Sequence, residues 1–171
     1  TIAAAVNYLS EHGISNLDEL DASLSSVSDK AYSIREGMKT AEQRMKELQK
    51  LMEYGRNYQT YKPIQDEYRQ IRWKGKQEKF AEARRAELTL WNAASRYLHA
   101  NLTDTKTLPI SKWKQEYADL KEQRDTDYTK LKATRAEVAE LQKIRKCVDI
   151  ALKAEQPEQI QTRTKRHDIE R

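Results

Sequence analysis

The feature that most constrains this fold is a long run of apolar residues spaced by three and four positions in turn. Its members are Leu17, Leu20, Leu24, Val27, Ala31, Ile34, Met38, Ala41, Met45, Leu48 and Met52. A mean spacing of about 3.5 residues keeps all of them on one helix face and is typical of left-handed coiled-coil packing. Asn16, with the acid Glu19 three residues later, is a capping-box pattern. We therefore expect a long first coiled-coil helix over residues 16–60.

The composition excludes folds that need many turns. The 171 residues include four Gly and three Pro, and 35% of the side chains are charged. So few turn-forming residues cannot build an all-β sandwich or barrel. A hydrophobic share of 37% is low for a compact globule and favours long helices around a thin core.

A second long coiled-coil helix is expected over residues 109–155. Ser111 is the expected N-cap, and the helix should end near Ala154, before Pro157. Its apolar positions are Trp113, Tyr117, Leu120, Leu131, Val138, Leu141, Val148 and Leu152, diluted by Arg124, Asp127, Thr134 and Arg145. Two helices of matched length fold most simply as an antiparallel pair. We therefore predict an all-α fold, a long antiparallel coiled-coil helical hairpin with a small helical tip insertion. A parallel dimer would also bury the first seam and is the alternative.

Three further segments complete the predicted organisation. Residues 1–15 should form a short helix, continuing from an upstream region and ending at Gly13. Residues 61–108 form the tip insertion, and residues 156–171 form a polar tail or linker. Within the insertion, Pro63 and Gly75 are expected to interrupt the helical pattern, leaving one helix over about residues 63–73 and another over about 77–100.

The net charge of +5 is concentrated in the middle of the chain. Residues 54–101 carry 10 Lys and Arg against 5 Asp and Glu, whereas residues 1–53 carry 6 against 9. A second, shorter basic patch runs from Thr162 to His167 in the tail. An electrostatic partner should therefore bind the tip insertion.

Aromatic and cationic residues alternate in that insertion. The candidate nucleic-acid-binding residues are Tyr61, Lys62, Arg69, Arg72, Trp73, Lys74, Lys76 and Lys79, together with the neighbouring Tyr58 and Tyr68. Cations contact phosphates and exposed rings stack on unpaired bases, so this mixture suits a nucleic-acid surface. The alternative is that the rings form a small core at the tip while the cations are merely solvated. Trp91 and Trp113 lie on helix faces and are expected in the core.

No catalytic, metal or cofactor site is expected. The histidines His12, His99 and His167 are isolated, and four scattered glycines form no phosphate loop. The single cysteine, Cys147, excludes an internal disulfide and fits a reducing compartment. No apolar run approaches the length of a membrane span. We therefore expect a cytoplasmic, non-enzymatic segment without a membrane partner.

Several short motifs resemble one protein family. Val6 to Ile14 reads VNYLSEHGI and resembles the NYLTEHGL segment that follows the catalytic domain of relaxases, the mobilisation nucleases of conjugative elements in Gram-positive bacteria. Further similar segments are Ala41–Met45 (AEQRM), Tyr58–Tyr61 with Tyr68–Arg69, Lys79–Phe80, Leu108–Pro109, Gln115–Ala118, and Val148–Asp149 with Leu152. The motifs occur in the family's order over about residues 1–153.

This resemblance implies the C-terminal accessory region of a relaxase, encoded on a mobile genetic element. In such proteins a separate domain nicks DNA with a tyrosine and a histidine-bound metal, and none of that apparatus is expected here. The resemblance implies a domain that assists binding of origin-of-transfer DNA or assembly of the relaxosome. The alternative is a coiled-coil protein–protein interaction or spacer module that holds the nuclease apart from a relaxosome or secretion-machinery partner and lacks DNA affinity. A homodimer is a third alternative.

Overall fold

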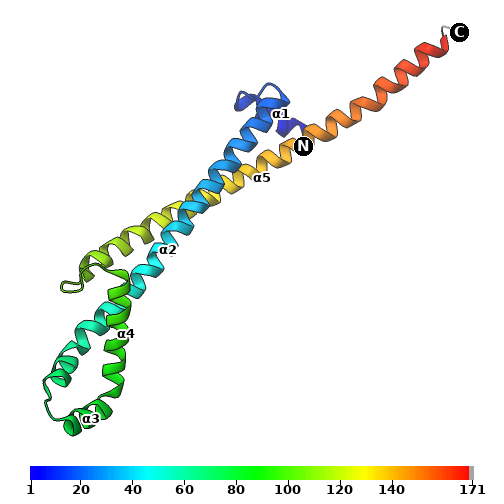
Figure 1. Cartoon of the computed structure of the whole chain (residues 1–171). Helices are drawn as coiled ribbons and strands as arrows, with labels where there is room; N and C mark the ends of the chain where they lie inside the picture. The colour runs from blue at the N-terminus through cyan, green and yellow to red at the C-terminus, as the bar shows by residue number, and fades with distance from the viewer. Residues whose placement is uncertain (170–171) are drawn as a thin grey trace. The chain divides into compact units, whose positions relative to one another are not determined.

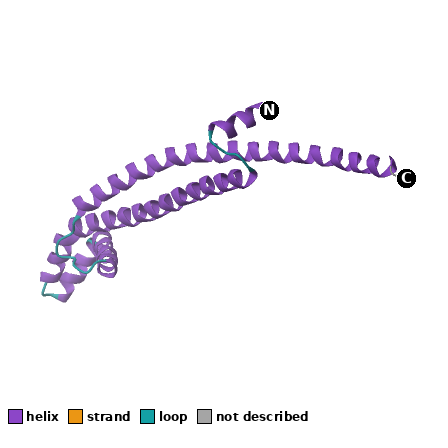
Figure 2. Ribbon diagram, turned by 90° about the horizontal axis from the view of Figure 1, so that it is seen from above, coloured by secondary structure: helices purple, strands orange, loops and turns teal. Residues whose placement is uncertain are grey.

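The computed structural model describes the backbone of residues 1–169 and the side chains of residues 1–155. The described backbone consists of helices and loops (Figure 2). The helices are α1 (Ile2–Glu11), α2 (Leu17–Gln70), α3 (Lys74–Ala83), α4 (Arg85–Asn101) and α5 (Ile110–Ile169), labelled in Figure 1. The two long helices α2 and α5 pack antiparallel, with the short helices α3 and α4 between them in the chain. The predicted all-α helical hairpin is therefore confirmed.

The chain forms two compact units. The terminal unit contains Thr1–Gly37 together with the chain from Thr126 onward, and the central unit contains Met38–Asp125. Each unit holds a stretch of α2 and a stretch of α5. The apolar seam of α2 supplies part of the core in both: every seam residue from Leu17 to Met52 is buried or half-buried.

The terminal unit is built on a cluster of Ala5, Leu20, Leu141 and Ile144. Leu20 and Leu141 are almost completely buried, at 1% and 0% exposure. Asn16 begins α2 as expected: its Oδ1 accepts from the Glu19 amide at 2.8 Å, while a Glu19 carboxylate oxygen accepts from the Ser15 amide at 2.7 Å. Asp21 of α2 accepts a 2.7 Å hydrogen bond from Arg145 Nε of α5.

The central unit packs α2, α4 and α5 around Leu48, Leu51, Met52, Leu98 and Trp113. Leu48 and Leu98 are fully buried. The rings of Tyr54 and Tyr97 stack with centroids 4.3 Å apart, which joins α2 to α4 at the edge of this core. Trp113, expected in the core, is 5% exposed.

The first long helix does not end near residue 60. Instead α2 runs through Pro63 to Gln70, so residues 63–70 belong to it and form no separate helix. A proline inside a helix removes one hydrogen bond. Burial on both sides of it outweighs that loss: Tyr58 stacks on Trp91, and Gln65 is 7% exposed.

The predicted break at Gly75 is also displaced. The chain leaves the helical conformation at residues 71–73 instead, and Gly75 lies inside α3. The expected helix over residues 77–100 is divided at Arg84, whose backbone angles of φ −111° and ψ 27° separate α3 from α4.

The second long helix starts where it was predicted, but its N-cap and its C-terminal end differ from the prediction. Pro109, not Ser111, precedes α5, and its carbonyl accepts from the Trp113 amide at 3.1 Å. Ser111 is therefore inside the first turn. At its other end α5 continues past Ala154 to Ile169, so Pro157 lies inside the helix and does not end it. The side chains of the basic patch from Thr162 to His167 lie outside the described residues.

Thr134 is a polar residue within the apolar face of α5, and a hydrogen bond allows its burial. Thr134 is 5% exposed, and its hydroxyl donates to the Lys130 carbonyl at 2.8 Å, so no buried hydroxyl is left unpaired there. Within the described part of the chain, no helix has an apolar stretch long enough to cross a bilayer.

Candidate nucleic-acid interface

The predicted basic and aromatic residues surround the turn between α2 and α3. Residues 71–73 form this turn, which backbone and side-chain hydrogen bonds tie to both helices. The Ile71 amide donates to the Tyr68 carbonyl at 3.3 Å, and the Gln77 amide donates to the Trp73 carbonyl at 2.9 Å. Gln77 Nε2 also donates to the Tyr68 carbonyl at 3.2 Å. The turn therefore holds Arg72 and Trp73 in a defined place.

Trp73 presents its indole to solvent. Trp73 is 73% exposed, whereas Trp91 and Trp113 are 8% and 5% exposed. Trp73 has an extended backbone, φ −89° and ψ 117°, as the residue before α3. A large apolar ring that solvent reaches so freely stabilises the fold little, and it offers a flat surface for stacking.

The tyrosines of the insertion behave differently, because they pack inward. Tyr58 stacks on Trp91 with a distance of 5.3 Å between the ring centroids, and the ring centroids of Tyr68 and Phe80 are 6.5 Å apart. Tyr61 is half-buried on α2. The two alternatives that the sequence left open are thus divided between residues: Tyr58 and Tyr68 belong to the packing of the unit, and Trp73 does not.

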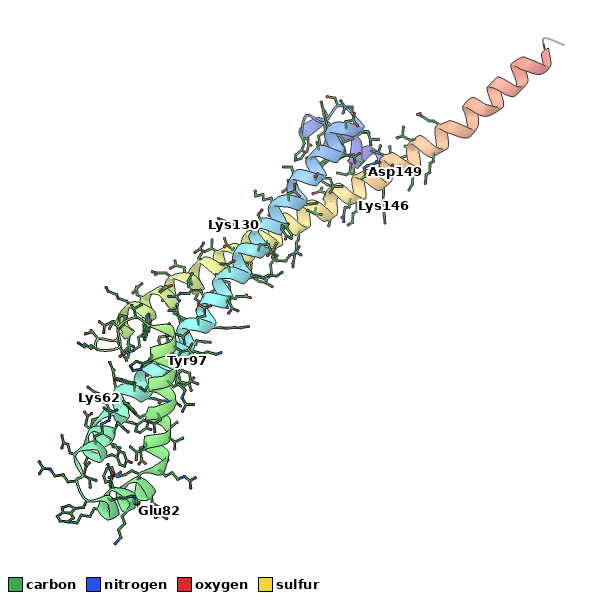
Figure 3. All side chains as sticks on the ribbon, viewed as in Figure 1. Lys62, Glu82, Tyr97, Lys130, Lys146 and Asp149 are labelled. Carbon is green, nitrogen blue, oxygen red and sulfur yellow. The ribbon has the colours of Figure 1, made fainter. Side chains whose placement is uncertain are left out.

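The predicted cations are exposed, and they differ in their surroundings. Arg72, Lys74, Lys76 and Lys79 are all exposed around the turn. The first turn of α3 contains no acid and has no side-chain cap. Arg69 is turned toward the protein, with its guanidinium carbon 5.8 Å from the centroid of the Trp91 ring. Lys62, also exposed, lies further back on α2, while the acid Glu82 lies on α3 (Figure 3).

Folding brings together a second group of cations that the sequence analysis did not identify. An open groove of the central unit is lined by Arg56 and Gln59 of α2 and by Lys112 and Lys114 of α5, with the hydroxyl residues Thr107 and Ser111 beside them. More than fifty positions separate Arg56 from Lys112 in the chain, so no local charge cluster marks this groove in the sequence.

The positive charge follows the division into units. The central unit contains 19 Lys and Arg against 13 Asp and Glu, a net charge of +6, whereas residues 1–37 and 126–155 contain 9 against 11, a net charge of −2. A polyanion is therefore attracted to the central unit. Among the described residues, no three His, Cys, Asp or Glu side chains come close enough together to hold a metal ion.

Comparison of the chain with protein-family models, with curated proteins and with solved structures finds no match.

Proposed function

We propose that this chain is a non-catalytic helical domain that binds nucleic acid through the turn between α2 and α3. The observation that carries the proposal is Trp73, 73% exposed and flanked by the exposed Arg72, Lys74 and Lys76. Lys and Arg neutralise phosphates and release their counterions, while an exposed indole stacks on a base. The net charge of the central unit supports the same partner, because it favours approach of a polyanion.

The resemblance to mobilisation relaxases supplies the biological setting of this proposal. In that setting the domain is an accessory region of a relaxase, and the nucleic acid is DNA at the origin of transfer. Its contribution is to hold that DNA, or to help assemble the relaxosome on it, while nicking belongs to another domain.

A binding titration tests the proposed surface. Labelled single-stranded and duplex DNA are titrated with the protein at two salt concentrations, and binding should weaken steeply as salt rises. Changing Arg72, Lys74, Lys76 and Lys79 together to Glu should remove most of the salt-sensitive binding. If binding is absent from the native protein, or is unchanged in this variant, the proposal is wrong.

A matched variant controls for total charge. Lys130, Arg135, Lys143 and Lys146 are exposed residues of α5 in the terminal unit. Changing these four to Glu alters the net charge of the chain by the same amount. Their replacement should leave most of the affinity in place, because they lie outside the proposed surface.

A second function is supported by apolar residues exposed in the terminal unit. Ile2 and Val6 of α1 are 64% and 57% exposed, and Ile150 of α5 is 67% exposed. Exposed apolar side chains are typical of surfaces that bind proteins where they form one contiguous patch. In this function the chain is an interaction or spacer module for relaxosome or secretion-machinery proteins, or it pairs with a second copy.

Sedimentation at several concentrations distinguishes these cases. A concentration-dependent mass that Val6→Glu and Ile150→Glu abolish supports a homodimer through this surface. A constant monomer mass excludes the homodimer. The interaction module without DNA affinity is favoured only if the DNA titrations are also negative and purified relaxosome proteins bind in a manner sensitive to the same two changes.

A further inference from the structure

The cationic groove of the central unit has a composition suited to phosphate. Its polar lining consists of Arg56, Gln59, Thr107, Ser111, Lys112 and Lys114, with no carboxylate among the lining residues. The three cations supply charge, and the amide and hydroxyl groups supply neutral donors. All six residues are exposed, so a chain of phosphates reaches them without displacing protein.

Packing beneath the groove explains why its two walls lie close together. A Cβ at Gly55 would lie 3.2 Å from Cζ3 of Trp113 and 3.5 Å from Cδ1 of Ile110, so the start of α5 packs directly on the α2 backbone. Arg56 follows Gly55 in α2, and Lys112 lies between Ile110 and Trp113 in α5. Both cations line the groove. The close approach of the two helices therefore brings the cations of α5 beside that of α2.

We propose that this groove is a second nucleic-acid contact, and that one bound DNA segment extends along α2 from the groove to the turn at Trp73. This inference rests on the proposed function. Both contacts belong to the central unit, and α2 connects them as one continuous helix from Arg56 to Gln70.

The length of α2 between the contacts sets the length of the DNA. Arg56 and Gln70 are about 21 Å apart along the helix axis, at 1.5 Å per residue. This distance corresponds to about six steps of a nucleic-acid strand at 3.4 Å per step. Oligonucleotides shorter than about six nucleotides should therefore reach one of the two contacts, and longer ones should reach both.

The face of α2 between the contacts carries both signs of charge. At about 100° per residue, Arg56, Glu67 and Gln70 lie within about 60° of one another around α2 and so share one face. Asp66, the neighbour of Glu67, points about 100° away around the helix. A strand that leaves Arg56 along this face passes one carboxylate, that of Glu67.

The experiment measures the affinity of the whole chain for fluorescent oligonucleotides of 4 to 20 residues, single-stranded and duplex, as a function of salt. We expect affinity to rise steeply up to about the spanning length and slowly beyond it. Lys112→Gln with Lys114→Gln should remove that rise and lower the slope of log K against log salt by about 1.4 on single strands and about 1.8 on duplex. These exposed changes keep the fold, which circular dichroism checks.

Two adjacent acids provide a matched pair. Glu67→Gln should strengthen binding of the longer oligonucleotides by removing a carboxylate from the path, and Asp66→Asn should have a smaller effect on them. Equal effects of the two substitutions contradict a strand that follows this face.

The outcomes separate this inference from the proposed function. If the quadruple change at the turn abolishes binding while the groove double variant retains the native affinity, length dependence and salt slope, the groove contact is refuted and the proposed function stands. If the native chain binds no DNA, both are refuted. Polyglutamate tests the alternative that the groove binds an acidic protein segment. If it displaces DNA from the groove at equal charge concentration, the groove is assigned to an acidic protein and its assignment to DNA is overturned.

Discussion

Arg44 and Glu116 form a two-point ion pair across 72 positions of the chain: Nε to Oε1 at 2.7 Å and Nη2 to Oε2 at 3.1 Å. Beside it, Gln49 Nε2 donates to the Tyr117 hydroxyl at 3.1 Å. Both contacts join α2 to α5 within the central unit. Because the fork of the guanidinium matches the carboxylate in one orientation, this pair favours one register of the two helices over its neighbours.

Glu116→Gln should reveal this ion pair through pH. The hydrogen bonds from Arg44 lower the pKa of the Glu116 carboxyl below its usual value. Ionised Glu116 therefore stabilises the folded state above the unfolded pKa of about 4.3, and this contribution disappears as pH falls through the lower folded pKa. Near pH 7 the free energy of unfolding of the native chain should exceed that of the variant by about 0.2–1 kcal/mol, a value typical of half-exposed ion pairs. Near pH 3 the two free energies should become similar. Urea unfolding at both pH values measures the difference, with Glu122→Gln as the control.

Gly37→Ala and Gly55→Ala should differ, although both glycines lie inside α2. Apart from its chain neighbours and the nearby backbone of α2, no atom lies within 4 Å of a Cβ added at Gly37, so alanine there should stabilise the helix by about 0.5–1 kcal/mol. At Gly55 the new methyl group meets the Trp113 ring at 3.2 Å, and the gain should be lost or reversed. Thermal unfolding of the two variants compares them directly, and an equal gain from both would contradict the close approach of α5 to Gly55.

Truncation of the central core should be costly. Leu48→Ala and Leu98→Ala each remove a fully buried side chain, and each should lower the free energy of unfolding by about 2–5 kcal/mol. Leu90→Ala on α4, where the leucine is 41% exposed, is the matched control and should cost clearly less. Denaturant titration gives all three values. Similar costs for Leu90 and Leu98 would show that the core is placed elsewhere.

Trp73→Ala should separate binding from stability. The exposed indole contributes little to the fold, so the free energy of unfolding should change by less than about 0.5 kcal/mol. Loss of one stacked base should weaken single-strand binding by about 1–3 kcal/mol. The quenching of tryptophan emission by acrylamide should also fall sharply, since Trp91 and Trp113 remain and are buried. A large loss of stability would instead place Trp73 in the packing of the unit.

The long helices and their contact faces could be predicted because they depend on local spacing. The seam from Leu17 to Met52 marked the buried face of α2 correctly at every position. Helix ends were harder to predict, since Pro63 costs one hydrogen bond and the packing of residues beyond it recovers more. That packing includes Arg69, whose guanidinium lies over the ring of Trp91, a residue distant in sequence.

The candidate site, like the fold, was predictable only where it depends on local sequence. Spacing and residue type were enough to establish two long amphipathic helices, a basic insertion between them and the charges around residues 69–79. Whether an aromatic ring is core or surface depends on what packs against it, so tertiary contacts placed Tyr58 on Trp91 and left Trp73 exposed. The groove that joins Arg56 to Lys112 likewise exists only because α5 packs against Gly55, a contact between segments too far apart in the chain for any local pattern to record.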